Sequence, residues 1–174
     1  MKSPEVYSVL RATLGPWFKV AGFKRAKGFL SWSRPSNGAH IVVWCQISQD
    51  GWDAFAGSKF VVEFQRSAGA VVGELSSRRQ RLAAFLSSPE REEVRSIQNA
   101  VIAKLPSVPK NHPALGVSLE VAQWYRDKFV SITEPYPEGH DVWFRYFYPA
   151  DVERWAQFIL RKLPACTAEA AGWG

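Results

Sequence analysis

The stretch His40-Ile41-Val42-Val43-Trp44-Cys45-Gln46-Ile47 decides the fold, because its apolar residues recur with period two. Alternation of this kind places successive side chains on opposite faces of a β-strand. One face carries Ile41, Val43, Cys45 and Ile47, and the other carries His40, Val42, Trp44 and Gln46. Both faces are partly apolar, so the sequence predicts that both are at least partly covered.

Two further strands are predicted on either side of this one. Residues 29–33 form the first, and Pro35-Ser36-Asn37-Gly38 supplies a turn, since Asn-Gly favours the positive φ angles of a tight hairpin. After Gln49-Asp50-Gly51, residues 59–66 alternate again. The region therefore predicts an antiparallel meander.

The N-terminal segment predicts a helix that begins at Ser3-Pro4-Glu5, where serine, proline and glutamate suit the first turn. Its apolar residues recur at helical spacing: Val6, Leu10, Leu14, Trp17 and Ala21. Gly15-Pro16 interrupts this pattern, because an internal proline removes a hydrogen bond and clashes with the preceding turn. We expect a kink or two short helices ending at Gly22.

The middle of the chain predicts helices. Leu82, Phe85 and Leu86 form a short apolar stripe behind the basic cluster 78–81, and a second helix opens at Ser88-Pro89-Glu90 and ends before Pro106. Residues 106–117 are the most loop-like. Residues 118–129 suit a helix, although their end also suits a strand.

The C-terminal part predicts a strand over Val142–Tyr148 and a helix capped by Asp151. Pro164 is expected to end that helix and to leave residues 165–174 as a loose tail. Together these elements predict one globular α+β domain over residues 1–174, with an antiparallel sheet of about four or five strands and helices packed on one face.

A resemblance to a known family rests on three groups of residues: Gly22-Phe23-Lys24-Arg25, then Phe29 and Trp32 leading to Arg34, then residues 41–48. This arrangement resembles the opening of the DUF4304 family of bacterial proteins, over roughly residues 1–68. The resemblance implies a small α+β domain in a bacterial, cytosolic setting. The family has no assigned function, so the resemblance supplies no catalytic residue.

Composition excludes several classes of protein. The 174 residues are 47% hydrophobic and contain two cysteines, which excludes a disulfide-stapled domain. Cys45 and Cys166 belong to no CxxC pair, so we expect reduced thiols in a cytoplasmic protein. There is no long apolar run and no signal-peptide pattern at the N-terminus, so neither a membrane span nor export is expected.

No catalytic or metal-binding motif is recognisable, so an enzyme is not favoured and no cofactor or metal is expected. The histidines His40, His112 and His140 are scattered and match no ligand spacing. His140-Asp141 beside Glu138 is the best catalytic candidate, because a carboxylate can orient an imidazole. The competing interpretation, a solvated turn, is favoured.

The second face of the predicted sheet is the main candidate site, because aromatic and polar side chains converge there, as is usual in binding surfaces. The candidate ligand- or partner-binding residues are His40, Trp44, Gln46, Glu63, Gln65, Trp143 and Arg145, with Lys59 beside them. The sequence thus predicts a non-catalytic binding or accessory protein for a protein or small molecule. The competing interpretation is a sheet face half covered by helices, with polar groups at its margin.

Nucleic-acid binding is the alternative function. The net charge is +6, and residues 1–88 hold 12 basic and 5 acidic side chains, a net +7. The candidate phosphate-binding residues are Arg78, Arg79, Arg81, Lys24, Arg25 and Lys27. This alternative predicts one continuous basic stripe that joins residues 78–81 to residues 24–27.

Overall fold

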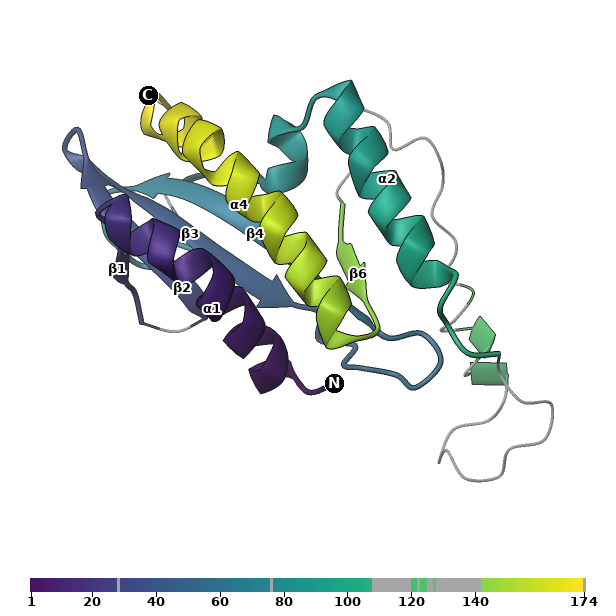
Figure 1. The fold of residues 1–174 in the computed structure, drawn as a ribbon. Helices are drawn as coiled ribbons and strands as arrows, with labels where there is room; N and C mark the ends of the chain where they lie inside the picture. Colours follow the sequence, from purple (N-terminus) through teal and green to yellow (C-terminus); the bar gives the residue numbers. More distant parts are fainter. Residues whose placement is uncertain are drawn as a thin grey trace.

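The computed structural model describes residues 1–27, 29–75, 77–107, 120–121, 123–124, 127 and 142–173. These residues form an α+β fold in which helices pack on one face of an antiparallel sheet (Figure 1). The fold class predicted from the sequence is confirmed. The predicted loop over 106–117, the segment 118–129 and the site at Glu138, His140 and Asp141 lie wholly or mainly outside the described residues.

The sheet contains six strands in the described part of the chain, against the four or five expected. The strands are β1 (Lys24–Arg25), β2 (Leu30–Ser36), β3 (Ala39–Ile47), β4 (Ser58–Ser67), β5 (Arg78–Arg81) and β6 (Phe144–Tyr146). Their order is β1-β2-β3-β4-β5, and β6 pairs with β4 beyond the end of β5. The predicted meander is therefore its centre.

The β2–β3 hairpin turns as its sequence predicts. Asn37 has φ 48° and Gly38 has φ 73°, the positive values that a two-residue turn requires. This turn sets the register, in which Trp44 lies opposite Ser31 on one side and Glu63 on the other. Glu63 in turn lies opposite Arg81 of β5.

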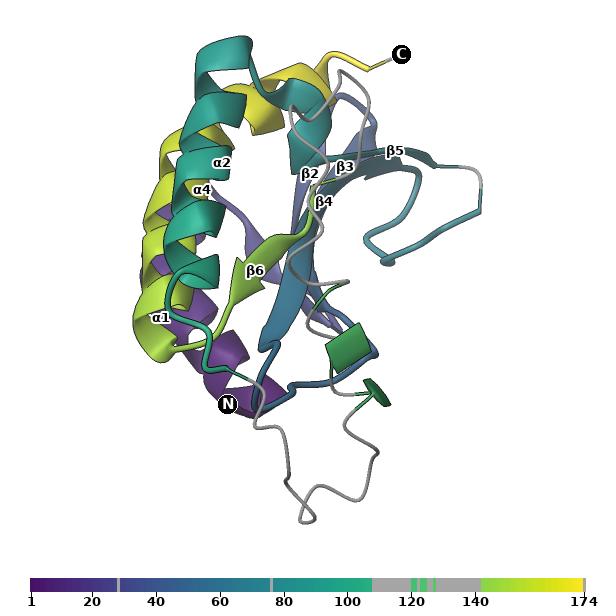
Figure 2. The ribbon, with the colours of Figure 1, turned by 90° about the vertical axis from the view of Figure 1, so that its right-hand side faces the viewer.

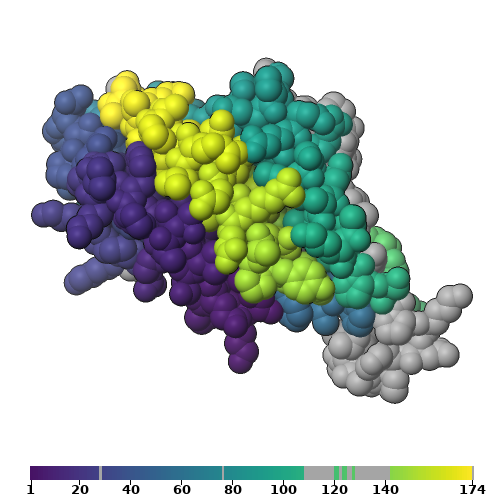
Figure 3. All heavy atoms as spheres, in the orientation of Figure 1, coloured from purple at the N-terminus to yellow at the C-terminus, as the bar shows by residue number. Residues whose placement is uncertain are grey.

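The helices α1 (Ser3–Val20), α2 (Ser88–Ile102) and α4 (Pro149–Ala171) lie on the same side of the sheet (Figure 2). Their outer surfaces form a continuous layer, with α4 between α1 and α2 (Figure 3). The main core lies under this layer. It includes fully buried residues of the central strands and of the helices: Ile41, Val43, Phe64, Phe18 and Trp155.

Helix α1 is one uninterrupted helix, so the break predicted at Gly15-Pro16 is wrong. Pro16 cannot donate to the carbonyl of Ala12, but both residues are exposed, so water can take the place of the lost bond. Leu14 and Phe18, on the buried side, continue the apolar stripe past the proline. Their burial offsets the cost of the proline.

Helix α4 runs through Pro164 to Ala171, so the predicted end at Pro164 and the predicted loose tail are also wrong. Pro164 lies on the exposed side of the helix, whereas Cys166, Thr167 and Ala170 are buried. The Thr167 hydroxyl donates to the Leu163 carbonyl oxygen at 2.7 Å. The final turns of α4 thus belong to the core.

The basic cluster Arg78–Arg81 is a strand and not the edge of a helix as expected. It is followed by a short 3-10 helix, η1 (Leu82–Phe85), and then by α2, which begins with the predicted serine, proline and glutamate. The strand conformation of β5 determines which face of the sheet each of its arginine side chains occupies. Arg79 and Arg81 lie on one face of the sheet, and Arg78 lies on the other.

Candidate functional site

The candidate site lies on the sheet face opposite to α1 and α4, here called the second face and defined by Val42, Trp44, Val61 and Glu63. The alternation of β3 and β4 directs these four side chains away from Ile41, Val43 and Phe64, which belong to the main core. All four are at most 9% exposed. The prediction that both faces of β3 are covered is therefore confirmed.

A groove of about 580 Å³ lies on the second face, and we call it the sheet groove. It crosses β3, β4 and β5, with Phe29, directly before β2, on one side and Val72 and Gly73 on the other. Its lining residues are Phe29, Trp44, Gln46, Glu63, Val72, Gly73, Arg79, Gln80 and Arg81. Residues from both predicted sets, the sheet-face set and the basic set, therefore meet in one place.

Glu63 lies between two arginines of β5 in the sheet groove. Its Oε1 is 3.6 Å from Nε of Arg79, and its Oε2 is 3.7 Å from Nε of Arg81. The Glu63 side chain is 12% exposed, whereas that of Arg79 is 49% exposed. Arg79 therefore joins a largely buried carboxylate to a half-exposed guanidinium in the lining of the groove, and its Nη1 lies beside Gly73.

Trp44 forms the covered base of the sheet groove and not an open aromatic floor. Its exposure is 3%, so the expectation of an indole available to a ligand is corrected. The accessible ring is that of Phe29, which is 52% exposed. Phe29 is absent from the predicted site, although its place before β2, opposite Gln46, follows from the hairpin register.

Gln65 positions the wall of the sheet groove. Its Nε2 donates to the Val71 carbonyl oxygen at 2.7 Å and to Ser67 Oγ at 2.6 Å, and its Oε1 accepts from the Gly73 backbone N–H at 2.8 Å. The side chain is fully buried. Gln65 therefore holds residues 71–73 against β4 and does not face a ligand directly.

Trp143 lies beside the sheet groove, where the ends of β5 and β6 meet. The Arg81 guanidinium carbon lies 5.3 Å from the Trp143 ring centroid, and Lys59 Nζ lies 5.4 Å from it. Gln98 of α2 donates to the Trp143 carbonyl oxygen at 2.9 Å. Arg145 pairs with Lys59 on the neighbouring strand and does not line the groove.

His40 lies at the other end of β3, opposite Pro35 and Ser67. It therefore stands apart from the sheet groove, which begins at Trp44. Its Nδ1 is buried and has no hydrogen-bond partner in the structure. The structure thus brings together Trp44, Gln46 and Glu63 of the predicted site, and it leaves His40 and Arg145 outside.

The basic residues of the alternative site are divided by the sheet. Arg79 and Arg81 line the sheet groove, whereas the Arg78 guanidinium lies 5.1 Å from the Trp173 ring, beyond the end of α4. Lys24 and Arg25 belong to β1, at the opposite edge of the sheet, with β2, β3 and β4 between them and β5. Lys27 lies two residues after Arg25. Strand pairing thus separates the two groups that the predicted stripe joins.

The two cysteines are buried and unbridged. Burial raises the pKa of the Cys45 thiol to about 12, and burial together with Glu169 and Glu90 raises the pKa of the Cys166 thiol to about 12. Both groups are therefore neutral thiols at physiological pH, and neither is an activated nucleophile.

The part of the chain that the structure describes shows neither a metal cluster nor a membrane-spanning helix. Those residues contain no group of three or more histidine, cysteine, aspartate or glutamate side chains arranged to hold a metal ion. No helix among them combines the length and the apolarity needed to cross a membrane.

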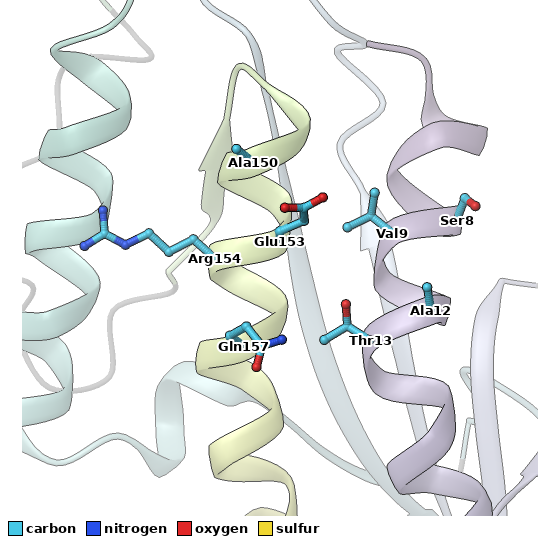
Figure 4. Close-up of a pocket in the computed structure, with 8 residues that line it drawn as sticks. All are labelled: Ser8, Val9, Ala12, Thr13, Ala150, Glu153, Arg154 and Gln157. Atoms are coloured by element: carbon cyan, nitrogen blue, oxygen red, sulfur yellow. The ribbon is translucent and has the colours of Figure 1, made fainter.

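A second groove, of about 520 Å³, lies on the outside of the helix layer between α1 and α4 (Figure 4). Its α1 wall consists of the short side chains Ser8, Val9, Ala12 and Thr13. On α4, Arg154 extends away from α1, toward α2, so it does not converge with Glu153 on a common point (Figure 4). The sheet groove, with its converging charges, is the better candidate.

Comparisons of this chain with protein-family models, with curated proteins and with solved structures found no match. The geometry of the grooves is therefore the evidence for function. The resemblance of residues 1–68 to the DUF4304 family stays a prediction.

Proposed function

We propose that this protein is a non-catalytic binding protein that takes a small organic monocarboxylate in the sheet groove. The observation that carries the proposal is the Arg79–Glu63–Arg81 arrangement, in which two guanidinium groups share one carboxylate. These charges sum to one positive charge at the groove. A single anionic group on a ligand balances that charge.

Arg79 is the residue that binds the anion in this proposal. It is half exposed, and its ion pair with Glu63 is made through Nε, so its Nη groups are further donors that a ligand can use. A guanidinium offers paired donors in a geometry that matches a carboxylate.

The remainder of the groove suits the apolar part of such a ligand. Phe29 and Val72 line opposite walls, and Gln46 supplies an amide between them. The volume of about 580 Å³ lies within the range of roughly 300–1,000 Å³ that small-molecule sites occupy. The proposed chemistry is binding alone: the described residues that line the groove include no histidine or cysteine, and the carboxylate among them, Glu63, is paired with two arginines.

The test is binding of benzoate, phenylacetate and isovalerate, measured by ligand-observed NMR and by calorimetry. We expect Arg79→Gln to weaken the best binder about tenfold or more, as loss of a charge-assisted hydrogen bond implies. The matched control is Arg78→Gln, which removes the same charge one position away but on the other face of the sheet. It is expected to change the affinity less than twofold.

Three outcomes would contradict the proposal: no binding by any of the three anions, equal losses in the two variants, or equal binding of the neutral analogue phenylacetamide. A thermal melt of each variant establishes that the fold is retained, since Arg79→Gln leaves Glu63 paired with Arg81 alone.

The remaining parts of the proposal concern the setting and the alternative function. A bacterial cytoplasmic location is supported by the DUF4304 resemblance and by the two unbridged thiols.

Nucleic-acid binding stays the alternative, and its support is the net charge of +6. It has to rest on Arg79 and Arg81 without Arg78, because Arg78 lies on the other face.

A further inference from the structure

A second binding site is suggested by the corner where α1 meets the start of β2. A pocket of about 350 Å³ lies there, lined by Tyr7, Arg11, Arg25, Phe29 and Leu30. The charged groups among its described lining residues are two arginines, and none of these residues carries a carboxylate. It shares only Phe29 with the sheet groove.

The two arginines of this corner pocket differ from four other cations of the protein, each of which forms an ion pair with a glutamate. Arg79, Arg81, Arg161 and Lys162 each have a glutamate partner. Among the described residues, the Arg11 side chain has no ion pair and no hydrogen bond. Burial, and after it the positive charge of Arg11, lower the pKa of the Arg25 guanidinium, so the two charges interact. Two like charges that adjoin without an acid form a site for an anion.

Arg25 is held in place before any ligand arrives. Its Nη1 donates to the Ser31 carbonyl oxygen, and its guanidinium carbon lies 5.2 Å from the Trp32 ring centroid. The Trp32 ring is itself stacked on Phe18 of α1, at 4.2 Å between centroids. Such preorganisation lowers the entropic cost of binding.

Tyr7 adds a neutral donor to the pocket. Burial raises the pKa of its hydroxyl, so the group stays protonated at physiological pH and can donate a hydrogen bond to a ligand.

We propose that Tyr7, Arg11 and Arg25 bind the phosphate group of a small phosphate monoester whose organic part packs on Phe29. The charges of the pocket select this class, because two unpaired guanidinium groups match a group with about −1.5 to −2 charges at pH 7. The sheet groove differs in this respect, since Glu63 already neutralises one of its two arginines. Phe29, 52% exposed, supplies the apolar contact.

The experiment titrates the full-length protein with phenyl phosphate and with inorganic phosphate, followed by NMR and calorimetry. Arg11→Gln is the first variant, since Arg11 is exposed on α1 and its replacement leaves the packing intact. We expect it, and also Arg25→Gln, to weaken phenyl phosphate binding about tenfold or more. Phenyl phosphate is expected to bind more tightly than inorganic phosphate, and Phe29→Ala is expected to remove that difference.

Two controls separate this site from other cations. Arg154→Gln removes an exposed arginine of α4 that points away from α1 (Figure 4), and Arg79→Gln removes the anion-binding group of the sheet groove. Neither is expected to change phenyl phosphate affinity more than twofold. The proposal is overturned if Arg11→Gln and Arg25→Gln bind like the parent, if Arg154→Gln loses as much, or if the loss follows Arg79→Gln instead.

Discussion

At the scale of single residues, Trp44 shows how one alternating strand serves two different environments. Ile41, Val43 and Cys45 of β3 lie in the main core under the helices. Trp44, between them in sequence, lies on the second face and is buried there, together with Val42 and Val61. A buried indole contributes mainly to stability, so the sheet groove depends on Trp44 for its base and on exposed residues for its contacts.

This distinction gives a testable prediction for Trp44→Ala. We expect the variant to lose about 3–5 kcal/mol of unfolding free energy in urea melts, because truncating a buried tryptophan removes apolar burial and leaves a cavity. The matched control is Phe29→Ala, whose ring is 52% exposed and which should cost less than about 1 kcal/mol. A loss below about 1 kcal/mol for Trp44→Ala would show that the indole is an accessible binding surface after all.

At the scale of elements, the C-terminal turns of α4 tie the helix layer to the sheet. Arg66 of β4 donates from Nη1 to the Ala171 carbonyl oxygen at 3.0 Å, which satisfies one of the free carbonyls at the helix end. Trp173 is 5% exposed and stacks on Phe85, at 5.8 Å between ring centroids. These contacts reach β4 and the 3-10 helix η1, both distant in sequence.

Removal of residues 165–174 should therefore destabilise the whole domain. We expect a chain that ends at Pro164 to lose 10 °C or more in melting temperature, on the order of 2 kcal/mol or more for a domain of this size. The smaller change Trp173→Ala should give part of that loss, so the prediction can be tested even if the shortened chain fails to fold. Melting temperatures of both variants within about 2 °C of the parent would instead indicate a loose tail.

The elements that the sequence predicts correctly are those whose local signals agree with their packing. The central strands and the Asn37-Gly38 turn are of this kind, since period two and turn chemistry both lead to the observed hairpin. The errors at Pro16 and Pro164 share one cause: each proline lies on the exposed side of a helix whose buried stripe continues past it. The sequence shows the proline, whereas its orientation depends on tertiary packing.

Strand β5, by contrast, is an element that its local sequence does not predict. Arg-Arg-Gln-Arg has no apolar alternation and no β-branched residue, and it becomes a strand because β4 offers it an edge to pair with. The candidate site was therefore predicted in part. Trp44, Gln46 and Glu63 follow from the alternation of β3 and β4, but the meeting of Glu63 with Arg79 and Arg81 requires the pairing partner of β4 to be known.

At the scale of the whole molecule, the fold distributes its basic side chains over separate surfaces. Arg79 and Arg81 face the sheet groove, Arg78 approaches the end of α4, and Arg11 with Arg25 forms the corner pocket. In our proposals the sheet groove and the corner pocket each bind a compact anion. A nucleic-acid backbone instead presents a row of phosphates, which a continuous basic surface binds best.

The salt dependence of nucleic-acid binding tests which arrangement governs function. If the positive charge acts only at separate sites, we expect weak binding to single-stranded DNA and RNA, with a shallow slope of log K against log salt, because few counterions are released at once. Fluorescence anisotropy from 50 to 300 mM salt measures this slope. A steep slope that becomes shallower when Arg79 and Arg81 are replaced by glutamine, but stays unchanged in Arg78→Gln, would contradict the expectation. That result would identify the sheet groove as a nucleic-acid surface, because only the arginines that face it would then contribute to the release of counterions.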